Sequence, residues 1–184
     1  MRISAIIKDE VYVLCICEGK AEEDIMNMLL DMDMLVFSRS DLIDNKIIKR
    51  CSVQKIQEKY LNISYEKPVY IIRVLDSRNE KFKLSKVYQE RYGSKMINLL
   101  TRPEIEILII IDKGDYSTYS RKYKSTIKPS DYCKTNYRIN NIKSSGIMNS
   151  VFPSLESLMN ALKIYNKYKP KGEHSIYSII KNYK

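Results

Sequence analysis

A continuous apolar run at residues 11–17, Val-Tyr-Val-Leu-Cys-Ile-Cys, constrains the fold more than any other feature of the chain. It shows no alternation of polar and apolar residues, which is typical of a strand buried on both faces of a parallel sheet. The run stops at Glu18-Gly19-Lys20. Residues 21–31 then place apolar side chains at helical spacing, with acidic residues in the first turn, where the helix dipole favours them. A strand, a tight glycine turn and a helix follow one another, and this order predicts an α/β fold.

Further segments continue the pattern of apolar strands and amphipathic helices. Predicted strands cover residues 34–37, 68–76 and 96–100, and predicted helices cover residues 53–61, 84–92, 105–112, 153–168 and 175–183. The apolar run at 105–112 suits a strand by itself, but Thr101 and Glu104 have the spacing of a helix capping box, which favours a helix. We therefore expect a mostly parallel central sheet flanked by helices, with C-terminal helices within 153–184.

The length and composition predict one folded domain over residues 1–184. A chain of 184 residues can bury one sizeable core, and its 44% hydrophobic and 29% charged residues are typical of globular proteins. Its longest apolar runs fall far short of the roughly 20 residues that span a bilayer. The first ten residues have only a short apolar stretch, broken by Lys8 and Asp9, and do not resemble a secretory signal. We expect a cytoplasmic protein with no membrane association.

The cysteines and the single histidine exclude several kinds of site. Cys15 and Cys17 are separated by one residue and lack the spacing of zinc ligands, and His174 has no second candidate ligand close to it in the sequence. One histidine also makes a Ser-His-Asp triad an unfavourable interpretation. The cysteines are therefore expected to be reduced thiols, and any catalysis is expected to use carboxylates, lysines, tyrosines or a metal ion.

The charge balance predicts a polyanionic partner. A formal net charge of +10 and a pI near 9.3 favour binding to nucleic acid, although the abundance of Lys, Ile, Asn and Tyr is also what an AT-rich genome would impose. Residues 113–143 lack a clear secondary-structure pattern and interleave basic residues with tyrosines, as in grooves that bind single strands. The alternative is a solvated basic loop. The nucleic-acid-binding candidates are Tyr119, Arg121, Lys122, Tyr123, Lys124 and Lys128.

Two of the predicted strands end in acidic residues, Glu18 and Asp76. Ligands of open α/β sheets bind beyond the carboxyl ends of the strands, and a pair of carboxylates there suits Mg²⁺ while a substrate phosphate completes its coordination. We expect the two carboxylates to lie within about 8 Å of each other, as a shared Mg²⁺ requires. The alternatives are a turn with solvated charges at Glu18 and a local cap formed by Asp76 and Ser77.

The stretch Glu18-Gly19-Lys20, with Glu22 close behind an apolar strand, resembles the first signature of Toprim (topoisomerase-primase) domains. In that family the first glutamate is the catalytic acid. The second signature is Asp-x-Asp, and the matching place here is Asp76-Ser77-Arg78, which replaces the second aspartate by arginine. Three outcomes stay open: Glu80 replaces the missing carboxylate, Arg78 binds phosphate directly, or metal catalysis is lost.

A third stretch, beginning at Arg102-Pro103-Glu104, resembles a segment of Toprim-like proteins from abortive-infection and phage-defence loci, in which the glutamate matching Glu106 lies near the acidic site. The resemblance covers roughly residues 11–120. It implies a Toprim-like Rossmann-type domain.

The same resemblance implies a function and a set of site residues. The implied activity is a nuclease or related phosphoryl-transfer enzyme that uses Mg²⁺ or Mn²⁺ on nucleic acid, with a role in phage defence. The resemblance also implies an ATPase or another defence protein as a partner, and a homo-oligomer is a further possibility. The implied catalytic residues are Glu18, Lys20, Glu22, Asp76, Arg78, Glu80 and Glu106, and the implied metal ligands are Glu18, Asp76 and Glu80. The alternatives are a non-catalytic Toprim-like protein that binds nucleic acid or a partner, and a nucleotide-sensing module.

Overall fold

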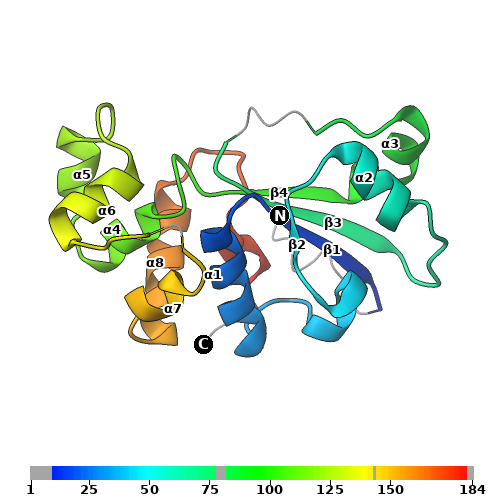
Figure 1. The fold of residues 1–184 in the computed structure, drawn as a ribbon, viewed down its shortest axis with the longest axis horizontal. Coiled ribbons are helices and arrows are strands. Elements are labelled where there is room, and N and C mark those ends of the chain that lie inside the picture. Colours follow the sequence, from blue (N-terminus) through cyan, green and yellow to red (C-terminus); the bar gives the residue numbers. More distant parts are fainter. Residues whose placement is uncertain (1–9, 78–81, 143, 182–184) are drawn as a thin grey trace.

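The computed structural model describes residues 10–77, 82–142 and 144–181, and its centre is a parallel β-sheet (Figure 1). The strands are β1 (Tyr12–Cys17), β2 (Ile48–Lys49), β3 (Val69–Leu75) and β4 (Met96–Leu100). They lie in the order β2-β1-β3-β4, and all three pairings are parallel. The predicted α/β fold with a parallel central sheet is therefore confirmed, and it is of the Rossmann-like type.

The register of the strands brings the ends of β1 and β3 to one edge of the sheet. Tyr12 is paired with Val69 and Cys17 with Val74, so the residues that follow both strands leave the sheet side by side. β4 ends at the same edge, where Leu75 is paired with Leu100. In Figure 1 this edge faces the part of the molecule formed by α4, α5, α6 and α8.

Helices connect the strands and continue beyond β4. α1 (Lys20–Asp31) follows β1, and α2 (Val53–Ile56) continues as a π-helical turn, η4 (Gln57–Leu61), before β3. The remaining helices are α3 (Lys86–Tyr92), α4 (Ile107–Asp112), α5 (Tyr116–Lys122), α6 (Pro129–Tyr137), α7 (Ile147–Val151) and α8 (Leu155–Tyr168). Four short 3-10 helices complete the described structure: η2 (Arg39–Asp41), η3 (Ile43–Asn45), η5 (Gly93–Lys95) and η6 (Ile176–Ile179).

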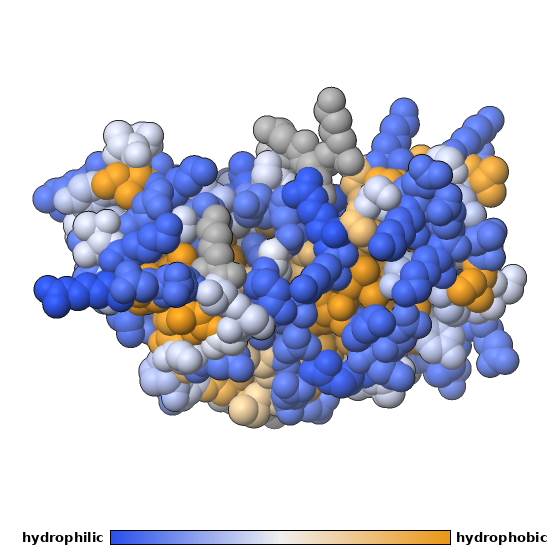
Figure 2. Space-filling model, viewed as in Figure 1, coloured by the Kyte–Doolittle hydropathy of each residue, from blue (hydrophilic) through white to orange (hydrophobic). Residues whose placement is uncertain are grey.

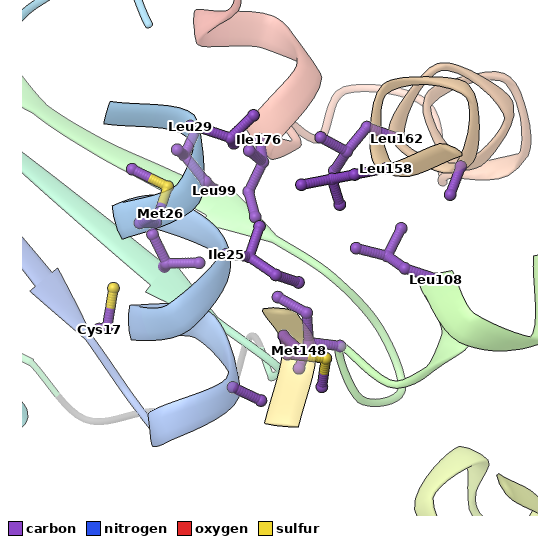
Figure 3. Close-up of a cluster of buried hydrophobic side chains, with 14 of the residues drawn as sticks. Cys17, Ile25, Met26, Leu29, Leu99, Leu108, Met148, Leu158, Leu162 and Ile176 are labelled. Carbon is purple, nitrogen blue, oxygen red and sulfur yellow. The ribbon is translucent and has the colours of Figure 1, made fainter. Parts of the chain in front are cut away.

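Apolar side chains cover both faces of the sheet. On one face, Cys17 and Leu99 of the strands join Ile25 of α1, Leu108 of α4 and Leu158 of α8 in the larger core (Figure 3). On the other face, a smaller core contains side chains from the strands and from α2, η4 and α3: Leu14, Ile71, Ile56, Leu61 and Tyr92. Because both faces are buried, the strands are mainly apolar, and polar side chains interrupt them only at Arg73 of β3 and Asn98 of β4 among the longer strands β1, β3 and β4.

Three segments differ from the sequence-based expectation. Of the helix predicted at 175–183, only the short 3-10 helix η6 forms within the described residues, and Ile180 is already extended. Residues 34–37 do not form a strand of the sheet, because Leu35 makes only an isolated antiparallel bridge to Ile180. The second strand along the chain is instead the two-residue β2. The basic segment 113–143 forms α5 and α6, which pack beside α4, so the solvated-loop interpretation of this segment is wrong.

The predicted helix at 105–112 is present as α4, but its start differs from a capping box. Glu106 is the N-cap of α4 and makes no side-chain capping hydrogen bond. The Glu104 carboxylate instead accepts a hydrogen bond at 3.0 Å from the backbone N–H of Ser130, in the first turn of α6. The Glu104 carboxylate therefore ties the segment before α4 to the first turn of α6.

The surface of the described residues is mainly polar on the face shown in Figure 2, with small apolar patches between charged side chains. Over the described ranges 10–77, 82–142 and 144–181, none of the helices combines the length and apolar character that a membrane crossing requires.

Candidate active site

A small acidic cavity lies where β1 and β3 end and α1 begins. Its volume is about 110 Å³, and its lining contains four acidic residues besides Glu18. The complete lining is Glu18, Gly19, Lys20, Ala21, Glu22, Asp76, Glu104 and Glu106. These residues come from the ends of two adjacent strands, from the first turn of α1 and from the segment before α4. Hereafter they are called the acidic pocket.

Glu18 and Asp76 are direct neighbours in the acidic pocket. The backbone N–H of Glu18 donates to the carbonyl of Val74 at 3.1 Å, which prolongs the pairing of β1 and β3 by one residue. The Glu18 Oε2 atom then accepts a hydrogen bond at 3.2 Å from the backbone N–H of Asp76. The parallel register therefore brings together two acidic residues that are 58 positions apart in the sequence.

Gly19 leaves room for the Glu22 carboxylate. Gly19 is the N-cap of α1 and has an extended backbone conformation. A Cβ atom at this position would stand only 2.7 Å from Glu22 Oε2, closer than a carbon and an oxygen atom normally approach. The glycine thus permits a close approach of the first turn of α1 to the end of β1, and this approach turns Glu22 into the pocket.

Glu22 is the most perturbed acid of the pocket. Its side chain is buried, with 6% of the residue exposed. Burial raises the pKa of Glu22 from 4.5 to about 7; the nearby charges of Glu106, Asp76 and Glu18 also raise it, while a hydrogen bond from its own backbone N–H acts in the opposite direction. A carboxyl group with this pKa exchanges its proton near neutral pH, which is a property of general acids and bases.

The other predicted catalytic residues are placed as follows. Lys20 lines the pocket and forms an ion pair with Glu23 at 3.0 Å, and Glu106 is buried with 3% of the residue exposed. The structure thus brings Glu18, Lys20, Glu22, Asp76 and Glu106 together. Arg78 and Glu80 lie outside the described residues.

The acidic pocket offers the donor type of a divalent-cation site without a complete coordination shell. Its carboxylate oxygens are the hard ligands that Mg²⁺ and Mn²⁺ prefer. Burial is the main cause of the raised pKa of Glu22, and a cation would relieve the repulsion among the carboxylates that adds to it. Within residues 10–77, 82–142 and 144–181, no three His, Cys, Asp or Glu side chains are close enough together to hold a metal ion. The pocket fits a cation chemically, and side-chain rotation would have to bring the oxygens together.

The predicted nucleic-acid-binding residues divide into exposed basic side chains and packed tyrosines. Arg121, Lys122, Lys124 and Lys128 are exposed. Tyr119, in contrast, has no exposed surface, and its hydroxyl donates to the carbonyl of Ile127 at 2.7 Å. Tyr123 is half-buried against the ring of Tyr132, with ring centroids 5.5 Å apart. The prediction that Tyr119 stacks on a base is therefore wrong, because this ring belongs to the core.

Two arginines near the acidic pocket were not predicted from the sequence as site residues. Arg50 follows β2 and donates to Glu18 Oε1 at 2.6 Å. Arg73 lies inside β3 and is buried against the ring of Phe82, 4.0 Å from its centroid; burial lowers its pKa to about 10, so it stays charged at neutral pH. The charged side chain within an apolar strand was the available signal for Arg73, whereas β2 is too short to point to Arg50.

Comparison with known proteins found no matching family model, no similar curated protein and no similar solved structure.

Proposed function

We propose that the acidic pocket is the active site of a metal-dependent phosphoryl-transfer enzyme, a nuclease that acts on nucleic acid. The observation that carries this proposal is the convergence of the acidic residues of three segments on one small cavity, with the pKa of Glu22 raised to about 7. Acids gathered at the carboxyl ends of parallel strands are suited to cation-assisted chemistry on phosphates. The resemblance of Glu18-Gly19-Lys20 to the first Toprim signature supports the same activity.

The roles of the residues follow from their positions. Glu18 and Asp76 are adjacent at the strand ends and would hold Mg²⁺ or Mn²⁺ together with an oxygen of the substrate phosphate. The cation, when bound, supplies stabilisation of the negative charge that develops on the phosphoryl oxygens. Glu22, with a pKa of about 7, takes up or releases a proton at the attacking or leaving oxygen. Buried Glu106 raises the pKa of Glu22 and so helps to keep that proton available.

A charge-neutralising substitution of Glu18 tests the proposal. Glu18→Gln keeps the size of the side chain and should abolish Mg²⁺-dependent cleavage of a fluorescently labelled single-stranded oligonucleotide. Glu90→Gln on α3, where the glutamate is exposed and away from the acidic pocket, is the matched control and should cleave as wild type. Far-UV circular dichroism checks that both variants fold. Undiminished cleavage by Glu18→Gln would exclude this glutamate from the chemistry.

A second candidate function is nucleic-acid or partner binding without catalysis. The ion pair between Arg50 and Glu18 favours it, because the arginine occupies one oxygen of a proposed metal ligand. This alternative predicts oligonucleotide binding that neither Mg²⁺ nor Glu18→Gln changes, and no cleavage under any metal condition. The same binding and cleavage measurements on the wild type and Glu18→Gln therefore separate the two functions.

The wider biological role rests on the resemblance alone. The likeness of the stretch from Arg102 to Toprim-like proteins of abortive-infection loci supports a cytoplasmic role in phage defence, with an ATPase as a partner. Co-purification of the chain with the products of neighbouring genes tests this part of the proposal separately from the nuclease activity.

A further inference from the structure

A second cavity adjoins the acidic pocket and shares Asp76 with it. Its volume is about 390 Å³, within the range of small-molecule sites, and α5, α8 and the segment after β4 contribute to its lining. Asp76 appears in the walls of both cavities. A ligand in the larger cavity therefore lies next to the acids of the proposed active site.

Two tyrosines give this cavity a stacking surface. Tyr116 of α5 and Tyr168 of α8 are stacked with their ring centroids 4.6 Å apart and their planes 24° from parallel. Tyr116 is half-buried, whereas Tyr168 is 58% exposed, which is unusual for a large aromatic side chain that lines a cavity. The helices that carry the two rings are separated in the sequence by α6 and α7, so the fold creates this surface.

The cavity also carries positive charge. Lys124 and Lys169 line it, and neither forms an ion pair with a carboxylate within the part of the chain that the structure describes. Arg102 lines it too, but its guanidinium is paired with the buried Glu173 at 2.6 Å. Among the described residues that line the cavity, the two lysines are thus the cations available to a ligand, and they line it together with the tyrosines.

From this combination we infer that the cavity binds one nucleotide unit, with the base on the ring of Tyr168 and the phosphate between Lys124 and Lys169. A base must be unpaired to stack on a tyrosine, so the favoured ligand is a single strand rather than a duplex. The shared wall at Asp76 places the phosphodiester bond of such a strand beside the acidic pocket. The inference rests on the proposed function for its substrate class, and adds where and in what form the substrate binds.

Aromatic and basic side chains have separate roles in this site. Stacking on tyrosine is insensitive to salt, whereas each lysine that neutralises a phosphate adds to the slope of the logarithm of affinity against the logarithm of salt concentration. Truncation of the ring should therefore lower the affinity at every salt concentration. Removal of the lysines should lower both the affinity and the slope.

The test is fluorescence anisotropy with a fluorescein-labelled ten-nucleotide oligodeoxythymidine, in EDTA and across a salt series. Tyr168→Ala should raise the dissociation constant by at least about fivefold, whereas Tyr168→Phe should bind within about twofold of wild type, because the ring is retained. The double variant Lys124→Ala/Lys169→Ala should lower the salt slope by about 1.4. The control Lys55→Ala/Lys86→Ala removes two exposed lysines from α2 and α3 and should leave the slope nearly unchanged.

Unchanged affinity of Tyr168→Ala would overturn the inference, and so would an equal loss of slope in the two lysine double variants. Competition by thymidine 5′-monophosphate distinguishes a free nucleotide from a nucleotide within a strand as the ligand. Displacement of the oligonucleotide by the monophosphate, lost in Tyr168→Ala, supports the same site with a free nucleotide as its ligand; failure to displace it supports a strand. Binding is measured in EDTA, where no metal-dependent cleavage occurs. A negative result in this binding test therefore does not decide the cleavage test with Glu18→Gln, and a negative result in the cleavage test does not decide this binding test.

Discussion

Neutralising Glu22 should make the protein more stable at alkaline pH. Ionised Glu22 is unfavourable in the folded state, because it is buried beside the charges of Glu106, Asp76 and Glu18. In Glu22→Gln the side chain has nearly the same shape and no charge. The variant should therefore unfold at higher urea concentration than wild type at pH 8.

The size of the effect follows from the pKa of Glu22. A rise from 4.5 in the unfolded chain to about 7 in the folded chain corresponds to about 3 kcal/mol. Because the folded pKa of this acid is raised, the protonated form stabilises the fold fully below about pH 4.5, and this contribution is lost as the pH rises through 7. The advantage of Glu22→Gln over wild type should thus grow by about 2 to 3 kcal/mol between pH 5 and pH 8.

The measurement is urea unfolding followed by far-UV circular dichroism at pH 5, 6, 7 and 8. Glu23→Gln is a neighbouring control on the same turn of α1; it loses the ion pair with Lys20 and should be slightly less stable than wild type. A stability difference between Glu22→Gln and wild type that is the same at every pH would contradict a raised pKa of Glu22, and so would a variant that is less stable than wild type at pH 8.

Substitutions at two more positions, Gly19 and Tyr119, test the local packing. Gly19→Ala should push the carboxylate of Glu22 out of the pocket, because the new methyl group would lie 2.7 Å from it; we expect cleavage to fall while stability at pH 8 changes by less than about 1 kcal/mol, and wild-type cleavage would contradict this. Tyr119→Ala should cost about 3 to 5 kcal/mol of stability, and Tyr119→Phe about 1 kcal/mol through the lost hydrogen bond to the carbonyl of Ile127. Tyr119→Phe should bind single strands as wild type does; weaker binding would show that the hydroxyl contacts nucleic acid.

The fold class was predictable because both faces of the sheet are buried. β1, β3 and β4 carry apolar runs that end at polar residues, and the sequence shows these runs directly. β2 is only two residues long, so it has no detectable pattern. The neighbouring Arg50 and its ion pair with Glu18 were therefore missed.

The candidate site was predictable where the position of a residue depends only on its neighbours in the sequence. Glu18 directly follows a buried strand and Glu22 lies in the first turn of the next helix, so the sequence places both. The burial of Tyr119 depends on α6, which packs against it from a later part of the chain, as the edge contact of the Tyr119 ring with Tyr132 shows. Stacking of Tyr116 on Tyr168 likewise depends on the approach of α5 and α8, and no sequence pattern predicts it.

The net charge of the whole chain and the charge of the acidic pocket have opposite signs. A net charge of +10 attracts a polyanion, whereas the carboxylates of the pocket repel the phosphate that would be cut. Two basic side chains at or beside the pocket already form ion pairs, Lys20 with Glu23 and Arg50 with Glu18. A divalent cation between the carboxylates and the phosphate would reconcile the two, because it would offset the repulsion that adds to the effect of burial on the pKa of Glu22 and would attract the phosphate at the same point. Lys124 and Lys169, which lie with Asp76 around the adjoining cavity, would then hold the neighbouring part of the strand in place.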